Sequence, residues 1–352
     1  MDTIKIPEAI EKIDAAFLTR ALSRGRPGVE VTSVHVGTVY LGTATKIRLL
    51  LEYNGVGHKY RLPPTMWFKA GFGRPFADII GNVWLNEARF FSDFAPQIKN
   101  VEIPKCYFAA GVEGAVDGVI LLEDLLQRNV EFYDVGPASV DIAAGILSLQ
   151  AAYHAVWWNR AELQKLPRSL DLAMESSFEY FFKPEVWDGI VAKPHAAPTP
   201  TRLKSGPTMA RAVRSMLDLA KEFPDTLIHG DAHIANSYVT ADGVPGFLDW
   251  QLAGRYASVS DVAYYLITSL SIEDRRRSEK TLLRQYHEAL SAGCADAPTY
   301  DQLWLGYRRF ALHAFCWVAV QESQQPLRRT TAITERAAAA VEDLETLKAL
   351  EV

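Results

Sequence analysis

The sequence lacks a long apolar run, a strong charge of either sign and a regular set of cysteines, and each absence excludes a class of protein. No apolar stretch approaches the roughly 18 residues that a membrane-spanning helix needs. The net charge of −5 offers no basic surface for nucleic acid. The three cysteines lie far apart and form no CxxC pair, which is typical of reduced thiols and gives no metal site. We therefore expect a cytoplasmic protein that neither inserts into membranes nor binds nucleic acid.

Length and composition indicate a globular protein with two domains. The hydrophobic fraction of 49% and the charged fraction of 22% are ordinary for a folded chain. At 352 residues the chain is too long for one simple core. Strand patterns dominate as far as Glu123 and helical patterns after it, which predicts domains over 1–123 and 124–352.

Apolar spacing predicts the elements within these two parts. In the first part we expect a helix over 6–23, two strands within 32–53, further strands over 65–70, 106–111 and 118–122, and a helix over 82–95. In the second part we expect helices over 138–160, 206–222, 258–270, 275–292, 299–324 and 331–350. Four prolines within 191–207 predict a flexible loop there.

An acidic segment over 227–251, LIHGDAHIANSYVTADGVPGFLDWQ, carries the clearest chemical pattern in the sequence. Short apolar runs over 226–228 and 246–248, with the turn residues Ala-Asp-Gly between them, are typical of a β-hairpin. Asp231 and Asp249 follow the two runs. We therefore expect both carboxylates in loops at the ends of strands.

The spacing within this segment points to phosphoryl transfer. Asn236 follows Asp231 by five residues and Asp249 follows Asp231 by 18. Magnesium prefers hard oxygen ligands, and a phosphoryl acceptor needs a carboxylate that orients its hydroxyl near the metal. The first spacing matches the D-x-x-x-x-N pattern of kinase catalytic loops. A polar turn capped by its own side chains is the alternative for Asp231 and Asn236.

Three motifs in order, HGDAHIAN, GFLDWQ and SDVAYYL, resemble the aminoglycoside phosphotransferase and choline kinase superfamily. The glutamine after the Asp-Trp pair and the segment SDVAYYLITS are most similar to its ecdysteroid-kinase-like branch. The resemblance extends over nearly the whole chain. It implies an α+β, bilobal, protein-kinase-like fold, with a small N-terminal antiparallel sheet plus a helix and a larger, mainly helical C-terminal lobe. It also implies ATP- and Mg²⁺-dependent phosphorylation of a hydroxyl on a small molecule.

The resemblance also implies roles for individual residues. Asp231 would be the catalytic base, and Asn236 and Asp249 would hold Mg²⁺. Asp261 would brace the catalytic loop, although an aspartate in the first turn of a helix also favours the helix dipole on its own. We expect His229 to support the loop through backbone and packing contacts; a direct chemical role is the alternative.

The resemblance also suggests roles for His233 and for the segment that joins the two parts of the chain. His233 either lines the substrate side or is a satisfied structural histidine. The segment GVILLEDLLQ resembles the hinge of the family, where backbone groups around Glu123 and Leu125 would pair with the edge of adenine.

The first part of the chain adds a set of weaker signals for nucleotide binding. Gly37 and Gly42 lie in a strand–turn–strand, where the missing Cβ atoms would let backbone amides approach phosphates, or where they simply shape a hairpin. Lys69 ends an apolar strand, so its ammonium can reach the α and β phosphates. Glu87 lies on an apolar helix face and needs a cation there. Lys69 is the expected partner; a half-exposed pair with Arg89 is the alternative.

The short segment after Asp249, the expected metal ligand, limits the class of molecule that can accept the phosphate. Only 11 residues separate Asp249 from Asp261, which leaves no room for a long activation segment, so we expect a small-molecule substrate and no protein substrate. Trp157 and Trp317 fall, with other aromatic residues, in segments that wall the acceptor cleft in relatives. They favour an apolar or sterol-like alcohol, although aromatic residues at helical spacing are typical of a core. An aminoglycoside- or choline-type acceptor is the alternative.

Two other classes of protein compete with this interpretation. A binuclear metallophosphoesterase would also use HGDAH, but the later G-D-x-x-D and G-N-H ligand motifs that it requires do not occur. A catalytically silent nucleotide-binding module, or pseudokinase, usually loses the base or the metal aspartate, and both are present here. Turnover of ATP in the presence of an alcohol discriminates between a kinase and a silent module.

Overall fold

The computed structural model describes residues 5–72, 83–112 and 117–352, and the chain divides into two compact units. Unit 1 comprises Met1–Lys99 and Ile103–Val130, and unit 2 comprises Asn100–Glu102 and Glu131–Val352. The sequence patterns change at Glu123, and the main division between the two units falls a few residues later, after Val130.

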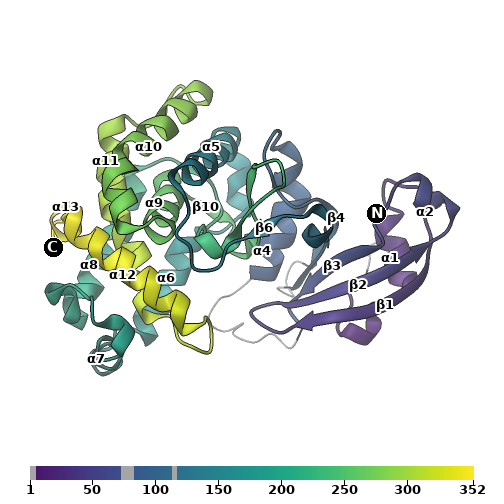
Figure 1. Ribbon diagram of the computed structural model, residues 1–352, viewed down its shortest axis with the longest axis horizontal. Coiled ribbons are helices and arrows are strands. Elements are labelled where there is room, and N and C mark those ends of the chain that lie inside the picture. The colour runs from purple at the N-terminus through teal and green to yellow at the C-terminus, as the bar shows by residue number, and fades with distance from the viewer. Residues whose placement is uncertain (1–4, 73–82, 113–116) are drawn as a thin grey trace. The chain divides into compact units, whose positions relative to one another are not determined.

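Unit 1 is built on one five-stranded sheet (Figure 1). Its strands are β1 (Val31–Tyr40), β2 (Thr45–Tyr53), β3 (Thr65–Ala70), β4 (Cys106–Val112) and β5 (Asp117–Glu123). They lie in the order β1-β2-β3-β5-β4, and every neighbouring pair is antiparallel. The expected strands are all present with nearly the expected bounds, and burial alternates along β2.

Helices complete the core of unit 1. Helix α1 (Ala15–Leu22) packs against β1 and β4, and Phe17 meets Phe68 and Phe108 edge-on, with ring centroids 6.1 and 5.9 Å away. The expected helix over 6–23 was too long at its start. The side chain of Asp14 caps the helix by accepting from the backbone N–H of Phe17 at 2.7 Å, so the residues before it take other conformations.

A second helical segment of unit 1 packs on β4 and β5. It comprises α4 (Val83–Arg89) and a π-helical turn, η2 (Phe90–Phe94), in place of the single helix expected over 82–95. Residue 82 lies outside the described residues. Two further short elements are α2 (Gly55–Lys59) and the 3₁₀ turn η4 (Leu125–Arg128).

Unit 2 is mainly helical and is organised around one buried helix. Every residue of α9 (Ser258–Ser269) is buried, because α5, α10, α11 and α12 and the strands β7 and β10 pack around it. The helices of unit 2, shown in Figure 1, are α5 (Val140–Trp157), α6 (Ser169–Tyr180), α7 (Pro184–Val191), α8 (Gly206–Leu219), α9, α10 (Ile272–Gly293), α11 (Tyr300–Phe315), α12 (Leu327–Asp343) and α13 (Thr346–Ala349).

The acidic segment does not form the single hairpin that the sequence predicted. β7 (Asp225–Ile228) pairs with β10 (Gly254–Ala257), a strand that the sequence analysis missed. β8 (Ser237–Val239) pairs with both β6 (Glu131–Phe132) and β9 (Pro245–Phe247), and β8 and β9 form the hairpin. Pairing between short strands depends on partners far away in the sequence, which local patterns do not specify.

The proline-containing segment 191–207 is packed and carries local structure, contrary to the expectation of a flexible loop. Two 3₁₀ turns, η6 (Pro194–Ala196) and η7 (Thr201–Lys204), shape it, and His195, Ala196 and Leu203 are buried. The indole N–H of Trp187 on α7 donates to the carbonyl of Leu203 at 3.0 Å. Proline restricts the backbone here without preventing burial. Helices α6 and α7, which precede this segment, were also missed.

Candidate active site

The loop after β7 begins with a residue that only glycine can occupy comfortably. Gly230 lies between His229 and Asp231 with a φ of 80°, and a Cβ atom there would lie 2.2 Å from the carbonyl oxygen of Leu252. This conformation turns the chain sharply at the end of the strand. Asp231 is consequently presented beyond the strand, as the sequence predicted.

Asp261 fixes this loop from the buried helix α9. Its carboxylate accepts from the backbone N–H groups of His229 at 2.6 Å and Gly230 at 3.0 Å, and from the hydroxyl of Tyr153 at 2.8 Å. Burial raises the pKa of Asp261, but His154 and His229 outweigh this, so the pKa lies below its ordinary value. The carboxylate thus contacts the loop directly and does more than favour the dipole of its own helix.

His229 supports the loop from the opposite side. Its Nε2 donates to the carbonyl of Leu248 at 3.0 Å, and its Nδ1 accepts from the backbone N–H of Asp231 at 3.2 Å. Burial lowers the pKa of this ring, which keeps the ring neutral. A neutral imidazole can donate from one nitrogen and accept at the other. The contacts are of the backbone and packing kind that the sequence analysis expected.

The Asp231 carboxylate is partly exposed and is held at both oxygens. Its side chain is 31% exposed. Oδ2 accepts from Nδ2 of Asn236 at 3.0 Å and lies 3.5 Å from Nε2 of His233, while Oδ1 accepts from the hydroxyl of Tyr264 at 3.3 Å. The Asn236 amide also donates to the backbone carbonyl of Asp231 at 2.9 Å. The carboxylate therefore has a defined orientation and still reaches solvent.

The charge state of Asp231 suits a proton acceptor. Burial raises its pKa, and the charge of Asp249 acts in the same direction. The electrostatic interaction and hydrogen bond with His233, together with the interaction with His229, outweigh both, so the pKa of Asp231 lies below its ordinary value. Asp231 is therefore ionised at neutral pH, as a general base must be.

Asp249 and Asn236 come together because the β8–β9 hairpin aligns them. The backbone N–H of Leu248 donates to the carbonyl of Asn236 at 2.9 Å, and Asp249 follows with φ and ψ both at 65°. This left-handed conformation is uncommon outside glycine and redirects the chain at the strand end. The influence of Asp249 on the pKa of Asp231 shows that the two carboxylates are electrostatic neighbours.

The donor set fits a hard divalent cation. The Asn236 amide nitrogen is used by Asp231, which leaves the amide oxygen as its free acceptor, and Asp249 adds a half-buried carboxylate. Oxygen ligands of this kind suit Mg²⁺. In the described part of the chain, no group of three or more His, Cys, Asp or Glu side chains is placed to hold a metal.

In unit 1 the structure pairs Lys69 with Glu87, as predicted. The Lys69 amine lies 2.9 Å from Oε1 and 2.8 Å from Oε2 of Glu87, and the two side chains are only 7% and 3% exposed. The cation on β3 and the carboxylate on α4 thereby fix each other. The alternative of a half-exposed Glu87 beside Arg89 does not hold.

The two glycines of the β1–β2 region have different surroundings. A Cβ atom on Gly37 would lie 2.9 Å from Cδ1 of Leu50 and 3.1 Å from the carbonyl oxygen of Arg48, so glycine allows the close approach of β1 to β2 there. A Cβ atom on Gly42 would have only the carbonyl of Ala44 nearby, at 3.7 Å. Gly37 therefore has a packing role of its own, and Gly42 lies in an open turn.

The segment predicted as a hinge is anchored by its acidic side chains. Oε1 of Glu123 accepts from the backbone N–H of Lys105 at 2.7 Å and pairs with Arg128 at 3.1 Å. Leu125 begins η4 and is buried. Asp124 between them, which the sequence analysis had not singled out, is a buried carboxylate. It accepts from Arg48 at 2.8 Å, Thr65 at 2.9 Å and Trp67 at 3.0 Å.

The residues predicted for the substrate side lie in different surroundings. His233 is buried beside Asp231, and its Nδ1 accepts from the backbone N–H of Ala235 at 3.1 Å. Trp317 is also buried, and it meets the His233 ring edge-on with centroids 5.0 Å apart. Trp157 is buried in α5 with Arg160 against its ring, which is the packing alternative that the sequence left open.

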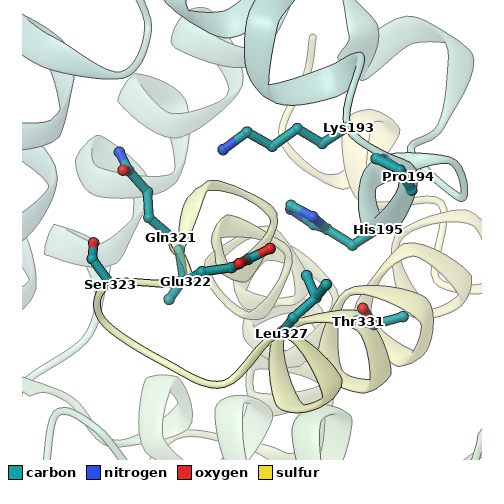
Figure 2. A pocket seen from close by; sticks show the side chains of 9 residues that line it. Lys193, Pro194, His195, Gln321, Glu322, Ser323, Leu327 and Thr331 are labelled. Carbon is teal, nitrogen blue, oxygen red and sulfur yellow. The ribbon is translucent and has the colours of Figure 1, made fainter.

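A pocket of about 640 Å³ lies in unit 2 beside the 3₁₀ turn η11 (Cys316–Ala319). Figure 2 shows Lys193, His195 and Glu322 turned toward the same hollow. His195 is buried, and its Nε2 donates to the carbonyl of Val318 at 3.0 Å, which ties η6 to η11. The pocket lining combines charged, polar and apolar side chains: Lys193, Pro194, His195, Val320, Gln321, Glu322, Ser323, Leu327 and Thr331.

Sequence reasoning missed Tyr264, which contacts Asp231 directly. The signal was available in the sequence. Tyr264 follows Asp261 by three residues on a helix, so the two side chains share one face. Because Asp261 faces the catalytic loop, Tyr264 faces it as well.

The family model that matches this sequence is the ecdysteroid kinase-like family, over residues 77–297. The match covers more than half of the chain. The chain belongs to the ecdysteroid kinase-like family. Membership confirms the superfamily and the branch expected from the motifs and identifies a small-molecule kinase. The matched region includes Glu87, Asp231, Asn236, Asp249 and Asp261.

A solved structure gives the same fold for this ecdysteroid kinase-like protein. A Plasmodium vivax ethanolamine kinase is 12% identical, with a TM-score of 0.51 over 89% of this chain and 83% of that chain. This likeness confirms the expected bilobal α+β fold. A microcompartment-associated aminopropanol kinase is 16% identical, with a TM-score of 0.48 over 95% of this chain and 98% of that chain. No curated protein matches the sequence significantly. None of the described helices is both long and apolar enough to cross a membrane.

Proposed function

We propose that this protein transfers the γ-phosphate of ATP, in the presence of Mg²⁺, to a hydroxyl group of a small molecule in the cytoplasm. The observation that carries the proposal is the state of Asp231. It is ionised, partly exposed, held by Asn236 and electrostatically close to Asp249.

Each residue of the unit 2 site has a distinct part in this proposal. Asp231 accepts the proton of the acceptor hydroxyl at a carboxylate oxygen as the oxygen–phosphorus bond forms. Asn236 and Asp249 hold Mg²⁺, which offsets the negative charge of the phosphates when it is bound. His229 and Asp261 keep the loop in place by the hydrogen bonds described above.

The residues of unit 1 supply nucleotide binding in the same proposal. Glu87 fixes the Lys69 amine, which contacts the phosphates as a point charge. Backbone groups near Gly37 and Gly42 approach the phosphates, and backbone groups at Glu123 and Leu125 pair with adenine. The free state of all three cysteines suits a reducing compartment.

For the acceptor we propose an apolar or sterol-like alcohol, bound at the pocket beside η11. The pocket volume of about 640 Å³ lies within the range of roughly 300 to 1,000 Å³ typical of small-molecule sites. Its apolar members, Val320, Leu327 and Pro194, suit a hydrocarbon skeleton, and its polar members suit hydroxyl groups. An amino alcohol is the second acceptor class, because Lys193 and Glu322 give the pocket charge and because the similar ethanolamine kinase is named for one.

The decisive experiment measures ATP consumption with MgCl₂ over a panel of hydroxylated sterols, aminoglycosides, choline and small amino alcohols. We expect at least one alcohol to stimulate turnover, with its phosphate ester identified by mass spectrometry. The matched control is Asp231→Asn on the same panel, which should lose the stimulation. ATP binding without turnover on every acceptor would support the catalytically silent module instead.

A further inference from the structure

Asp231 depends on a second group of side chains that neither the sequence motifs nor the family match assigns to it. This group comprises Tyr264 on α9, Trp317 in η11 and His313 on α11. All three side chains are buried within unit 2. Tyr264 contacts the carboxylate, and the other two contact Tyr264.

The Tyr264 hydroxyl is fixed on two sides. It accepts a hydrogen bond from the indole N–H of Trp317 at 2.5 Å, so its own proton is left for Oδ1 of Asp231, 3.3 Å away. The tyrosine ring is stacked on His313, with centroids 4.4 Å apart and planes inclined by 16°. Because an indole N–H only donates, Trp317 sets the direction in which the hydroxyl points.

The tyrosine also has a stable protonation state. Burial, followed by the charge of Asp231, raises the pKa of Tyr264 well above its ordinary value. Burial lowers the pKa of His313 to about 4, so that ring is neutral under ordinary conditions. The hydroxyl therefore stays a neutral donor to the carboxylate.

We propose that Tyr264, held by Trp317, is a positioning residue that fixes the rotation of the Asp231 carboxylate. Asn236 engages Oδ2 and Tyr264 engages Oδ1, so the plane of the carboxylate is fixed by donors at both ends. Each carboxylate oxygen has two acceptor sites, so positions remain for the hydroxyl of the acceptor. This inference rests on the proposed function, since it concerns the group that we propose as the base.

Replacement of the hydroxyl alone tests the inference. In Tyr264→Phe the ring can keep its stacking on His313, while the donor to Asp231 is lost. We expect kcat to fall by a factor on the order of 10 to 100, with the KM values for MgATP and for the acceptor within about twofold of the original, because misplacing a catalytic group mainly affects the reaction step. The assay uses MgATP with the acceptor found by the panel, and MgATP alone with water as the acceptor.

The neighbouring tyrosine provides a matched control. Tyr265 lies on the same helix and is fully buried, and its hydroxyl interacts with Ser237 and Ser269 and makes none of the hydrogen bonds to Asp231 described above. Tyr265→Phe should leave kcat unchanged, so that loss of a buried hydroxyl from α9 is not itself the cause. Trp317→Phe should lower kcat, but it should add little in the Tyr264→Phe background, because the indole acts through the lost hydroxyl.

Two kinetic outcomes would overturn the inference. They are an unchanged kcat in Tyr264→Phe, with or without a raised acceptor KM, and an equal fall in kcat in Tyr265→Phe. A crystal structure of Tyr264→Phe gives a readout independent of activity. We expect the Asp231 carboxylate to rotate or to occupy two orientations, and an unchanged orientation would reject the positioning role. If instead no acceptor is phosphorylated, or Asp231→Asn is fully active, the proposed function fails and the crystal structure still decides the role of Tyr264.

Discussion

The two polar sites of this protein, one in each unit, are stabilised in opposite ways. In unit 1 the Lys69–Glu87 pair is almost fully enclosed, with side chains 7% and 3% exposed, and the Lys69 ammonium neutralises the Glu87 carboxylate. In unit 2 the Asp231 side chain is 31% exposed, and an amide and a phenol are among its donors. The first arrangement fixes the position of a cation, and the second keeps a carboxylate oriented and accessible. We therefore expect damage to the first site to appear mainly as lost stability and damage to the second mainly as lost turnover.

The largest effect should come from Glu87→Ala. The substitution removes the counter-charge of a buried amine, which typically costs about 3 to 5 kcal/mol. Urea unfolding should show this loss in the free energy of unfolding. The double variant Lys69→Met/Glu87→Leu is the control, because replacing both partners by apolar side chains is often nearly neutral. It should recover most of the stability and still lack nucleotide binding. If Glu87→Ala were as stable as the original protein, the Lys69–Glu87 pair would not contribute to stability, and the contrast between the two sites would be wrong.

The second effect concerns turnover in unit 2. Asp231→Asn should lower kcat by a factor on the order of 10² or more, the typical contribution of a general base. Calorimetric titration should show MgATP affinity nearly intact, and urea unfolding should show a change smaller than that of Glu87→Ala, because the side chain is partly exposed. Normal turnover in this variant would remove Asp231 from the role of base.

A smaller effect is expected for the metal site. Asp249→Ala should weaken binding of the magnesium–nucleotide complex by a factor on the order of 10, since one oxygen ligand is lost. Asp242→Ala is the matched control, because Asp242 is an exposed aspartate in the turn of the same hairpin. Titration with Mg²⁺ at fixed ATP separates the two variants. An unchanged magnesium dependence in Asp249→Ala would exclude this residue as a ligand.

The smallest effect should be the pH dependence that Asp124 contributes to unit 1. Burial raises the pKa of Asp124, but hydrogen bonds from Arg48, Trp67 and Thr65 outweigh it, so the pKa lies below its ordinary value. A carboxyl with a lowered pKa contributes stability above its ordinary pKa and loses that contribution as the pH falls through the pKa of the folded state. Urea unfolding of Asp124→Asn between about pH 7 and 3 should therefore depend less on pH than that of the original protein. Identical slopes would show that Asp124 titrates alike in the folded and unfolded chain.

The placement of the candidate site residues in unit 2 could be predicted from the sequence because it is encoded locally. Asp231, Asn236 and Asp249 occur at short spacings within one segment, and the hairpin between β8 and β9 suffices to bring the last two together. The Lys69–Glu87 pair was also predictable, because a carboxylate on an apolar helix face needs a cation and few are available nearby. The strands of unit 1 were predictable from their apolar runs and from the turn residues between them.

The features that the sequence analysis missed depend on contacts between distant segments. β7 pairs with β10 rather than with β9, and the 191–207 segment packs against other parts of unit 2 in spite of its prolines. Tyr264, which the sequence analysis missed, accepts a hydrogen bond from the indole N–H of Trp317, 53 residues later in the chain. Local patterns state which residues are apolar or polar but not which distant partner each will meet.

By itself, the sequence determined which groups we propose as reactive in this protein, since residue type and short spacing fix which side chains can bind a metal or accept a proton. Only the tertiary structure decided how those groups are held. The orientation of Asp231 depends on Asn236 five residues away, on Tyr264 in a buried helix and on Trp317 beyond the next two helices. Such hydrogen bonds form only when packing brings distant segments within about 3 Å of one another, and no local pattern encodes that distance.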